Sequence, residues 1–150
     1  MKVGLPDINV LIALAWPSHV HHHHARRWFD SDSRDGWATC PFTQTGFIRI
    51  SSNPKILPYA VTPHEALLLL KQLTTRGKHT FWPADLDFTA DAELPVQALI
   101  GHKQVTDAYL LGLATRCRGK LVTLDRNIVN LLPQSSPQRN VIEVIRVDGG

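Results

Sequence analysis

The sequence is poor in cysteine and has no long apolar run, and each shortage excludes a class of protein. Only Cys40 and Cys117 occur among the 150 residues, far apart and without a CxxC pairing. This spacing excludes both a disulfide framework and a cysteine zinc site. No apolar run reaches the roughly 20 residues that a membrane-spanning helix needs. We therefore expect a soluble protein with reduced thiols and no membrane partner.

The beginning of the chain lacks the pattern of a secretion signal, because Pro6 and Asp7 precede any long apolar stretch. We expect the protein to remain in the cytoplasm. The composition, 43% hydrophobic and 19% charged, is typical of a globular chain. Because there is no internal repeat and no long linker, residues 1–150 are expected to form a single domain.

Glutamate is also scarce, since ten of the thirteen acidic residues are aspartate and three are glutamate. Aspartate is a poor helix former that favours caps, turns and sites for hard metal ions. The net charge of +3 permits a nucleic-acid partner but does not require one. The positions of the aspartates are therefore more informative than the total charge.

Hydrophobic patterning predicts strands that alternate with helices. The expected strands are 2–5, 37–40, 79–82, 120–124 and 141–147, and the expected helices are 9–15, 18–30, 43–51, 62–73, 91–100, 106–116 and 126–132. Thr62 and Glu65 have the spacing of a capping box. This alternation is typical of an α/β fold with three layers, in which helices cover both faces of a mostly parallel sheet of four or five strands.

Three aspartates are expected at one edge of that sheet. Asp7 directly follows the first strand, Asp125 follows the fourth, and Asp107 lies at the N-terminal tip of the helix 106–116, on its buried stripe. Each carboxylate taken alone is explained better as a helix cap. Together they would repel one another unless a cation lay among them. Oxygen ligands without cysteine or histidine favour Mg²⁺ or Mn²⁺ over zinc.

The order of four segments resembles that of the PIN-domain ribonucleases, and specifically the VapC toxins of bacterial toxin–antitoxin modules. The segments are 7–14 (DINVLIAL), 43–50 (TQTGFIRI), 104–111 (QVTDAYLL) and 121–126 (LVTLDR), which together span nearly the whole chain. The resemblance implies a PIN-like three-layer fold and a Mg²⁺-dependent endoribonuclease. It also implies a homodimer and a cognate VapB-like antitoxin that holds the enzyme inactive.

By this resemblance Asp7, Asp107 and Asp125 match three of the four acids of the family, and Asn9 matches the polar position beside the first. Asp7 and Asp107 would hold the ion, and Asp125 would support the ion or its water. The family usually carries glutamate where this chain has Gln44. Since an amide lacks the negative charge, we expect weaker metal binding with cleavage retained. The alternative is that Gln44 is only a polar residue of a packing helix.

Other residues have supporting roles in this interpretation. Asn9 and Thr123 are candidates for orienting the metal ligands or the substrate. The candidates for contacts to the RNA backbone are Arg26, Arg27, Arg49, Lys103 and Arg126, although each alone is explained better as a solvated surface charge. The resemblance places antitoxin contacts near the early helices, where Trp16, Trp28 and Phe29 are apolar candidates, with core packing favoured for the last two.

The run His21–His24 is expected in an amphipathic helix, with Val20, His24 and Trp28 on its inner stripe, and a metal-binding role for it is disfavoured. Two alternative functions remain open. One is a catalytically weak module that binds RNA or an antitoxin, which Gln44 keeps under consideration. The other is a phosphoacceptor signalling domain. It is disfavoured because Lys120 precedes its strand, whereas that class needs a lysine after a late strand.

Overall fold

The structure is a computed structural model that describes residues 2–147. Within these residues, five strands form one sheet in which every pairing is parallel, in the order β3-β2-β1-β4-β5. The strands are β1 (Gly4–Pro6), β2 (Trp37–Thr39), β3 (His79–Phe81), β4 (Lys120–Thr123) and β5 (Ile142–Val144). The expected fold class is thereby confirmed, and the sheet is wholly parallel in the described part of the chain.

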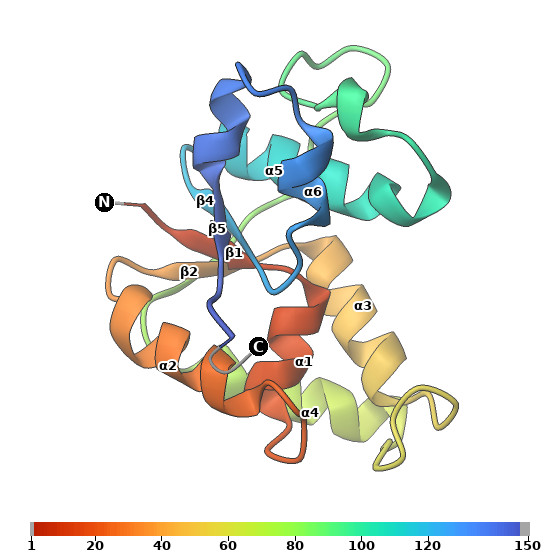
Figure 1. Cartoon of the computed structure of the whole chain (residues 1–150). Helices are drawn as coiled ribbons and strands as arrows, with labels where there is room; N and C mark the ends of the chain where they lie inside the picture. The colour runs from red at the N-terminus through yellow and green to blue at the C-terminus, as the bar shows by residue number, and fades with distance from the viewer. Residues whose placement is uncertain (1, 148–150) are drawn as a thin grey trace.

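Helices connect the strands and cover both faces of the sheet (Figure 1). The α-helices are α1 (Ile8–Ala15), α2 (His22–Asp32), α3 (Pro41–Ser51), α4 (Pro63–Leu73), α5 (Val105–Arg116) and α6 (Asn127–Leu131). Short 3-10 turns occupy η1 (Val96–Ala98), η2 (His102–Gln104) and η3 (Pro137–Val141). The predicted capping box is confirmed at the start of α4, where Thr62 and Glu65 exchange two hydrogen bonds of 3.1 Å.

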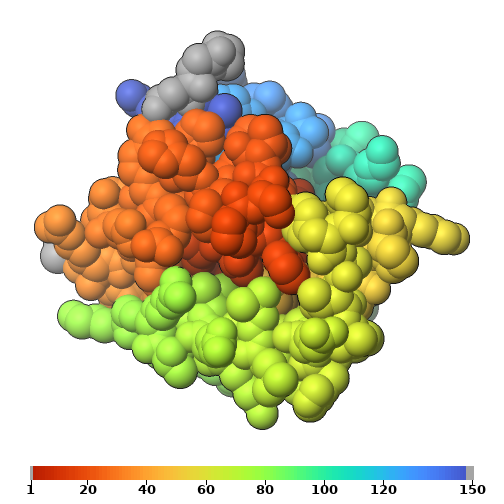
Figure 2. Space-filling model, turned by 90° about the horizontal axis from the view of Figure 1, so that it is seen from below, coloured from red at the N-terminus to blue at the C-terminus, as the bar shows by residue number. Residues whose placement is uncertain are grey.

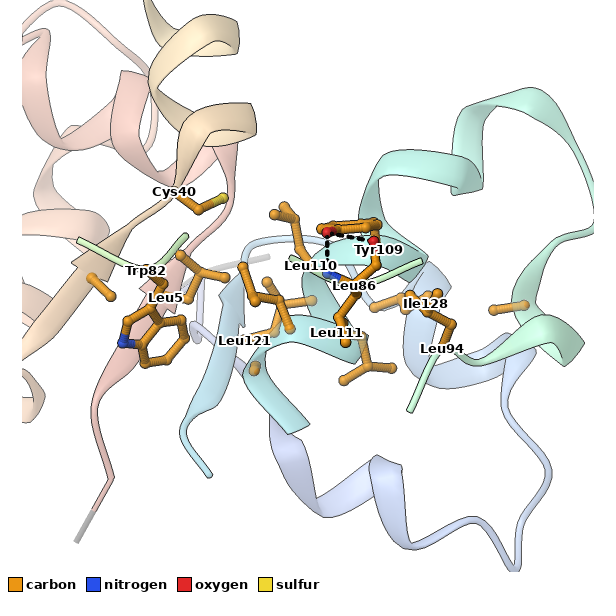
Figure 3. Packing of buried hydrophobic residues seen from close by; sticks show 14 of the residues in the cluster. Leu5, Cys40, Trp82, Leu86, Leu94, Tyr109, Leu110, Leu111, Leu121 and Ile128 are labelled. Carbon is orange, nitrogen blue, oxygen red and sulfur yellow. Dashed lines mark hydrogen bonds between the residues drawn. The ribbon is translucent and has the colours of Figure 1, made fainter. Parts of the chain in front are cut away.

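Two apolar clusters hold the layers together. On the side of α5 and α6, Leu5 and Leu121 of the sheet pack against Leu110 and Ile128 of the helices (Figure 3). On the other side Trp37 packs with residues of α1, α2, α3 and α4. Figure 2 shows the outer surface of this second side, where the segment around α2 (orange) borders α4 (green) and the end of α3 (yellow). The arrangement is the three-layer, PIN-like fold that was expected.

Two helix predictions were wrong in part. The helix expected over 18–30 begins only at His22, and Val20, expected on its inner stripe, is 80% exposed. A turn replaces its first residues, closed by a hydrogen bond from His21 N to His19 Nδ1. The helix expected over 91–100 is a loop with the single turn η1. Pro95 has no N–H to donate and interrupts any helix there.

Candidate metal centre

Asp7 is fixed at the carboxyl end of β1 and is almost fully buried, with 6% of its surface exposed. Its backbone N–H donates to Val122 O of β4 (2.9 Å), and its Oδ1 accepts a hydrogen bond from Val10 N (2.9 Å) as the N-cap of α1. Asp7 therefore caps α1, which is the role that the sequence favoured for each of these carboxylates taken alone. It also directly follows β1 and lies at the edge of the sheet where ligands bind in parallel α/β folds.

Thr123 connects two of the candidate acids. This buried residue ends β4, and its hydroxyl forms a hydrogen bond with the Asp7 carboxylate. The same hydroxyl oxygen accepts a hydrogen bond from Asp125 N (3.0 Å). Thr123 therefore lies where a residue that orients the acids has to lie.

Asp125 and Asp107 approach from two other elements. Asp125 is exposed, and its carboxylate accepts hydrogen bonds from the backbone N (2.9 Å) and side-chain Nδ2 (3.2 Å) of Asn127, at the start of α6. Asp107 is half-buried in the first turn of α5. Both acids therefore face the positive ends of helices, which offsets part of their mutual repulsion.

The three carboxylates act on one another electrostatically. Burial raises the pKa of Asp7 to about 7, with smaller contributions in the same direction from the charges of Asp107 and Asp125, while hydrogen bonds from Thr123 and Val10 oppose the shift. The pKa of Asp107 is also raised, by burial and then by the charge of Asp125. The charges identified as acting on Asp7 are both negative, so this edge of the sheet favours a cation.

The donor set fits a hard divalent ion but not a closed protein cage. Among residues 2–147, no three His, Cys, Asp or Glu side chains form a group able to hold a metal ion. Mg²⁺, however, is usually bound by one or two carboxylates and keeps several waters or substrate phosphate oxygens. Asp7 and Asp107 supply such a pair. The prediction that these two residues hold the ion stays a prediction.

Gln44 belongs to a polar chain, a series of side-chain hydrogen bonds, that the sequence did not predict. Its Nε2 donates to Thr39 Oγ1 (3.0 Å), and Thr39 Oγ1 lies 2.8 Å from His79 Nε2. Burial lowers the pKa of His79, which favours the neutral ring as a hydrogen-bond acceptor from the Thr39 hydroxyl. The amide nitrogen of Gln44 is then turned toward Thr39. Only the position of Thr39 at the end of a strand hinted at this contact.

α3, which carries Gln44, is in close contact with α1, which begins directly after Asp7. Gly46 of α3 lies against Ile8, the residue after Asp7, and a Cβ on Gly46 would lie only 2.3 Å from Ile8 Cδ1. A glycine permits this approach because it has no side chain. Gln44 is half-buried and lies two residues before the contact. Its placement is compatible with both interpretations of this residue.

The remaining candidates are distributed unevenly. Asn9 is exposed in the first turn of α1, and Lys103 and Arg126 are exposed close in sequence to Asp107 and Asp125. Arg49 is exposed in the last turn of α3. Arg26 forms an ion pair with Asp30 (3.6 Å) within α2. Arg27 lines a cavity of about 380 Å³ between α2 and the segment from Glu143 to Arg146, which none of the three acids lines.

Comparison with known proteins gives relatives over nearly the full length, although no protein-family model matches the chain. Ribonuclease VapC39 of Mycobacterium tuberculosis is 42% identical over 142 residues, covering 95% of this chain and 99% of the relative. Ribonuclease VapC38 of the same organism is 44% identical over 132 residues, with 88% and 92% covered. Ribonuclease VapC44 is 40% identical over 125 residues, with 83% and 87% covered.

Proposed function

The chain belongs to the VapC ribonuclease family, and on this basis we propose that it is the toxin of a toxin–antitoxin module and cleaves RNA endonucleolytically with Mg²⁺ or Mn²⁺. The observation that carries the proposal is the convergence of Asp7, Asp107 and Asp125 on one edge of the sheet. In the described part of the chain no helix is long and apolar enough to cross a membrane.

The acidic and polar side chains of the site have different proposed roles in phosphodiester hydrolysis. Asp7 and Asp107 would hold the ion, and Thr123 keeps the Asp7 carboxylate oriented through its hydroxyl. A bound divalent ion lowers the pKa of a water and offsets the charge of the scissile phosphate. Asp125 is the exposed member. Each of its carboxylate oxygens already accepts one hydrogen bond from Asn127 and would use a remaining lone pair to accept from the attacking water. Asn9, exposed beside Asp7, orients the substrate.

Basic side chains near the acids would bind the RNA backbone. Lys103 and Arg126 are both exposed and flank the acidic edge in sequence, so they are the strongest candidates. Arg49 is also exposed, farther along α3. Arg26 and Arg27 lie on α2 and are better placed to contact a protein partner than the scissile phosphate.

A VapB-like antitoxin and a second copy of the chain complete the proposal. Among the apolar residues considered for antitoxin contacts, Trp28 is only 3% exposed and belongs to the core. Phe29 packs on Trp37, with ring centroids 5.5 Å apart. Trp16 is half-buried and donates from Nε1 to Ser51 Oγ (3.1 Å). Trp16 and Phe29, both half-buried, therefore remain candidates for such a contact.

Metal removal tests the enzymatic function directly. We expect the purified chain to cut RNA when Mg²⁺ or Mn²⁺ is present, and chelation by EDTA to stop cleavage until the ion is restored, because carboxylates alone cannot offset the phosphate charge. The measurement is the appearance of new RNA ends on a sequencing gel. Cleavage that continues at the same rate in EDTA would contradict the proposal.

A specific observation bears on each alternative. Gln44 supports a binding module without catalysis, and RNA binding without any cut in Mg²⁺ would favour it. The phosphoacceptor function stays disfavoured because of its lysine. Asp7 does follow the central strand β1, but Lys120 lies at the opposite end of β4 from Asp125 and pairs with Glu143 (2.5 Å).

Replacing Gln44 with glutamate tests the departure from the family. We expect Gln44→Glu to bind Mg²⁺ roughly fivefold more tightly, because an added negative charge near an ion is worth about 1 kcal/mol in a solvated site. In this variant the Thr39 hydroxyl can donate to the new carboxylate, and His79 Nε2 can donate to the Thr39 oxygen. Both hydrogen bonds then persist with donor and acceptor exchanged. Isothermal titration with Mg²⁺ measures the change.

Gln44→Met is the matched control, since it keeps the side-chain length but offers neither a charge nor an amide. It should bind Mg²⁺ no more tightly than the natural chain. If Gln44→Glu also shows no gain in Mg²⁺ affinity, or loses cleavage, then Gln44 is only a polar residue that packs α3 against the sheet.

A further inference from the structure

An apolar cleft opens beside the acidic tip of α5. It has a volume of about 500 Å³ and is lined by Phe88, Leu99, Ile100, Gly101 and Val105. Its apolar side chains are unusually accessible, with Phe88 40%, Ile100 72% and Val105 43% exposed. Val105 precedes Asp107 by two residues of the same helix, which is about 3 Å along the helix axis. The cleft therefore lies at the same end of α5 as Asp107, although none of the three acids lines it.

Three aromatic rings extend the cleft toward α3. The Tyr109 ring packs with both the Phe42 ring (centroids 4.9 Å apart) and the Phe88 ring (5.5 Å). Tyr109 is rigid, because its hydroxyl accepts from Leu86 N (2.9 Å) and donates to Leu86 O (3.0 Å), as Figure 3 shows. Phe42, on α3, is 46% exposed. The fixed Tyr109 ring thus supports the partly exposed rings of Phe42 and Phe88.

The charges around the cleft indicate what kind of occupant it suits. None of the residues that line it in the described chain is acidic. The exposed His102 and Lys103 lie between Gly101 and Val105 in the sequence, and one exposed acid, Asp87, directly precedes Phe88. Aromatic faces next to cationic groups are the surfaces on which unpaired bases stack while the phosphates stay near positive charge. One of the acids that would act on the phosphate, Asp107, lies in the first turn of α5.

We propose that Phe42, Phe88 and the apolar cleft bind unpaired bases of the RNA that flank the scissile phosphate. This inference rests on the proposed ribonuclease function and names the substrate feature that the site recognises: single-stranded RNA with exposed base faces. In this arrangement Lys103 binds the backbone phosphates of the same nucleotides. Double-stranded RNA, whose bases are stacked on one another, lacks a free face for these rings.

The experiment measures RNA binding without cleavage. All proteins carry Asp7→Asn so that the RNA stays intact, and labelled short single-stranded RNA homopolymers are titrated by fluorescence anisotropy. We expect Phe88→Ala to weaken binding roughly 5- to 100-fold, the effect of losing one stacked base, and Phe42→Ala to weaken it similarly. Phe88→Tyr keeps a ring at this position and should restore most of the affinity.

Two controls distinguish a loss of base stacking from a general loss of RNA affinity. Leu68→Ala removes an equally exposed apolar side chain from α4, in the opposite layer, and should leave RNA binding unchanged. An abasic oligomer with the same phosphates should bind the Phe88→Ala protein and its parent equally well. Unchanged binding of base-containing RNA by Phe88→Ala, or an equal loss with the abasic oligomer, overturns the inference.

The competing occupant is a second copy of the chain. If the cleft were instead an interface between copies, Phe88→Ala would reduce self-association in sedimentation velocity while RNA affinity per chain stayed the same, and the inference would fail. The proposed function is tested separately, by cleavage with the natural Asp7. Cleavage that is indifferent to Phe88 and Phe42 rejects only the base-binding cleft, whereas base-dependent binding without any cleavage rejects only the enzymatic function.

Discussion

Replacing Asp107 with asparagine should reduce RNA cleavage by roughly a thousandfold or more. Charge stabilisation by a catalytic metal ion is worth several kcal/mol, and each 1.36 kcal/mol corresponds to a factor of ten in rate. Asparagine keeps the shape of the side chain in the first turn of α5 but removes the charge that a divalent ion needs. The fold should be unaffected, because the substitution relieves repulsion among the acids.

The measurement is made both in cells and with purified protein. Expression of the natural chain should arrest growth and produce new RNA ends, and both effects should disappear with Asp107→Asn. Asp30→Asn is the matched control, since Asp30 lies on α2 in an ion pair with Arg26 and should not matter for cleavage. Growth arrest and identical RNA cuts with Asp107→Asn would show that the catalytic site is elsewhere.

Replacing Asp7 with asparagine should have two opposite effects, loss of cleavage and a gain in the stability of the metal-free protein. The pKa of Asp7 is about 7 in the folded chain, against an ordinary value of 3.8, and burial is the main cause. The folded state therefore holds a proton that the unfolded state releases between pH 4 and pH 7, and the free energy of unfolding falls as the pH rises through this range. At 1.36 kcal/mol per pKa unit, the ionised carboxylate costs up to about 4 kcal/mol above pH 7.

Asparagine removes this penalty and retains the helix cap, because its side-chain oxygen can still accept from Val10 N. In EDTA the variant should be more stable than the natural chain by roughly 2–4 kcal/mol at pH 8, with the difference gone at pH 4. Urea denaturation at several pH values measures this. Added Mg²⁺ should stabilise the natural chain and not the variant. A stability difference that does not vary with pH would disprove the proposed cost of Asp7.

Local patterns predicted most of the fold because they depend on near neighbours in sequence. The capping box of Thr62 and Glu65 and the apolar stripe that buries Leu110 and Leu111 were both predictable. The start of α2 was not, because helix periodicity cannot show that Pro17 and the following turn leave Val20 in solvent. The interruption of the helix 91–100 at Pro95 was expected, but not that only the single turn η1 would remain of it.

The candidate site was predictable only in part, for a related reason. Residues that end strands or begin helices converge by the rules of parallel sheets, and this located Asp7, Asp107 and Asp125. Contacts between side chains distant in sequence follow no such rule. The hydrogen bonds from Gln44 through Thr39 to His79, and the stacking of Phe42 and Phe88 on Tyr109, required three-dimensional coordinates.

The strand order has a consequence for how the site survives thermal fluctuations. Sheets open first at their edges, which here are β3 and β5. The strands that carry Asp7 and lead to Asp125 are β1 and β4, each paired on both sides. Partial opening at either edge leaves the pairing of β1 with β4 intact, so Asp7 and the strand that leads to Asp125 belong to the part of the sheet that opens last. The chain can thus tolerate an electrostatically costly site without local unfolding at that site.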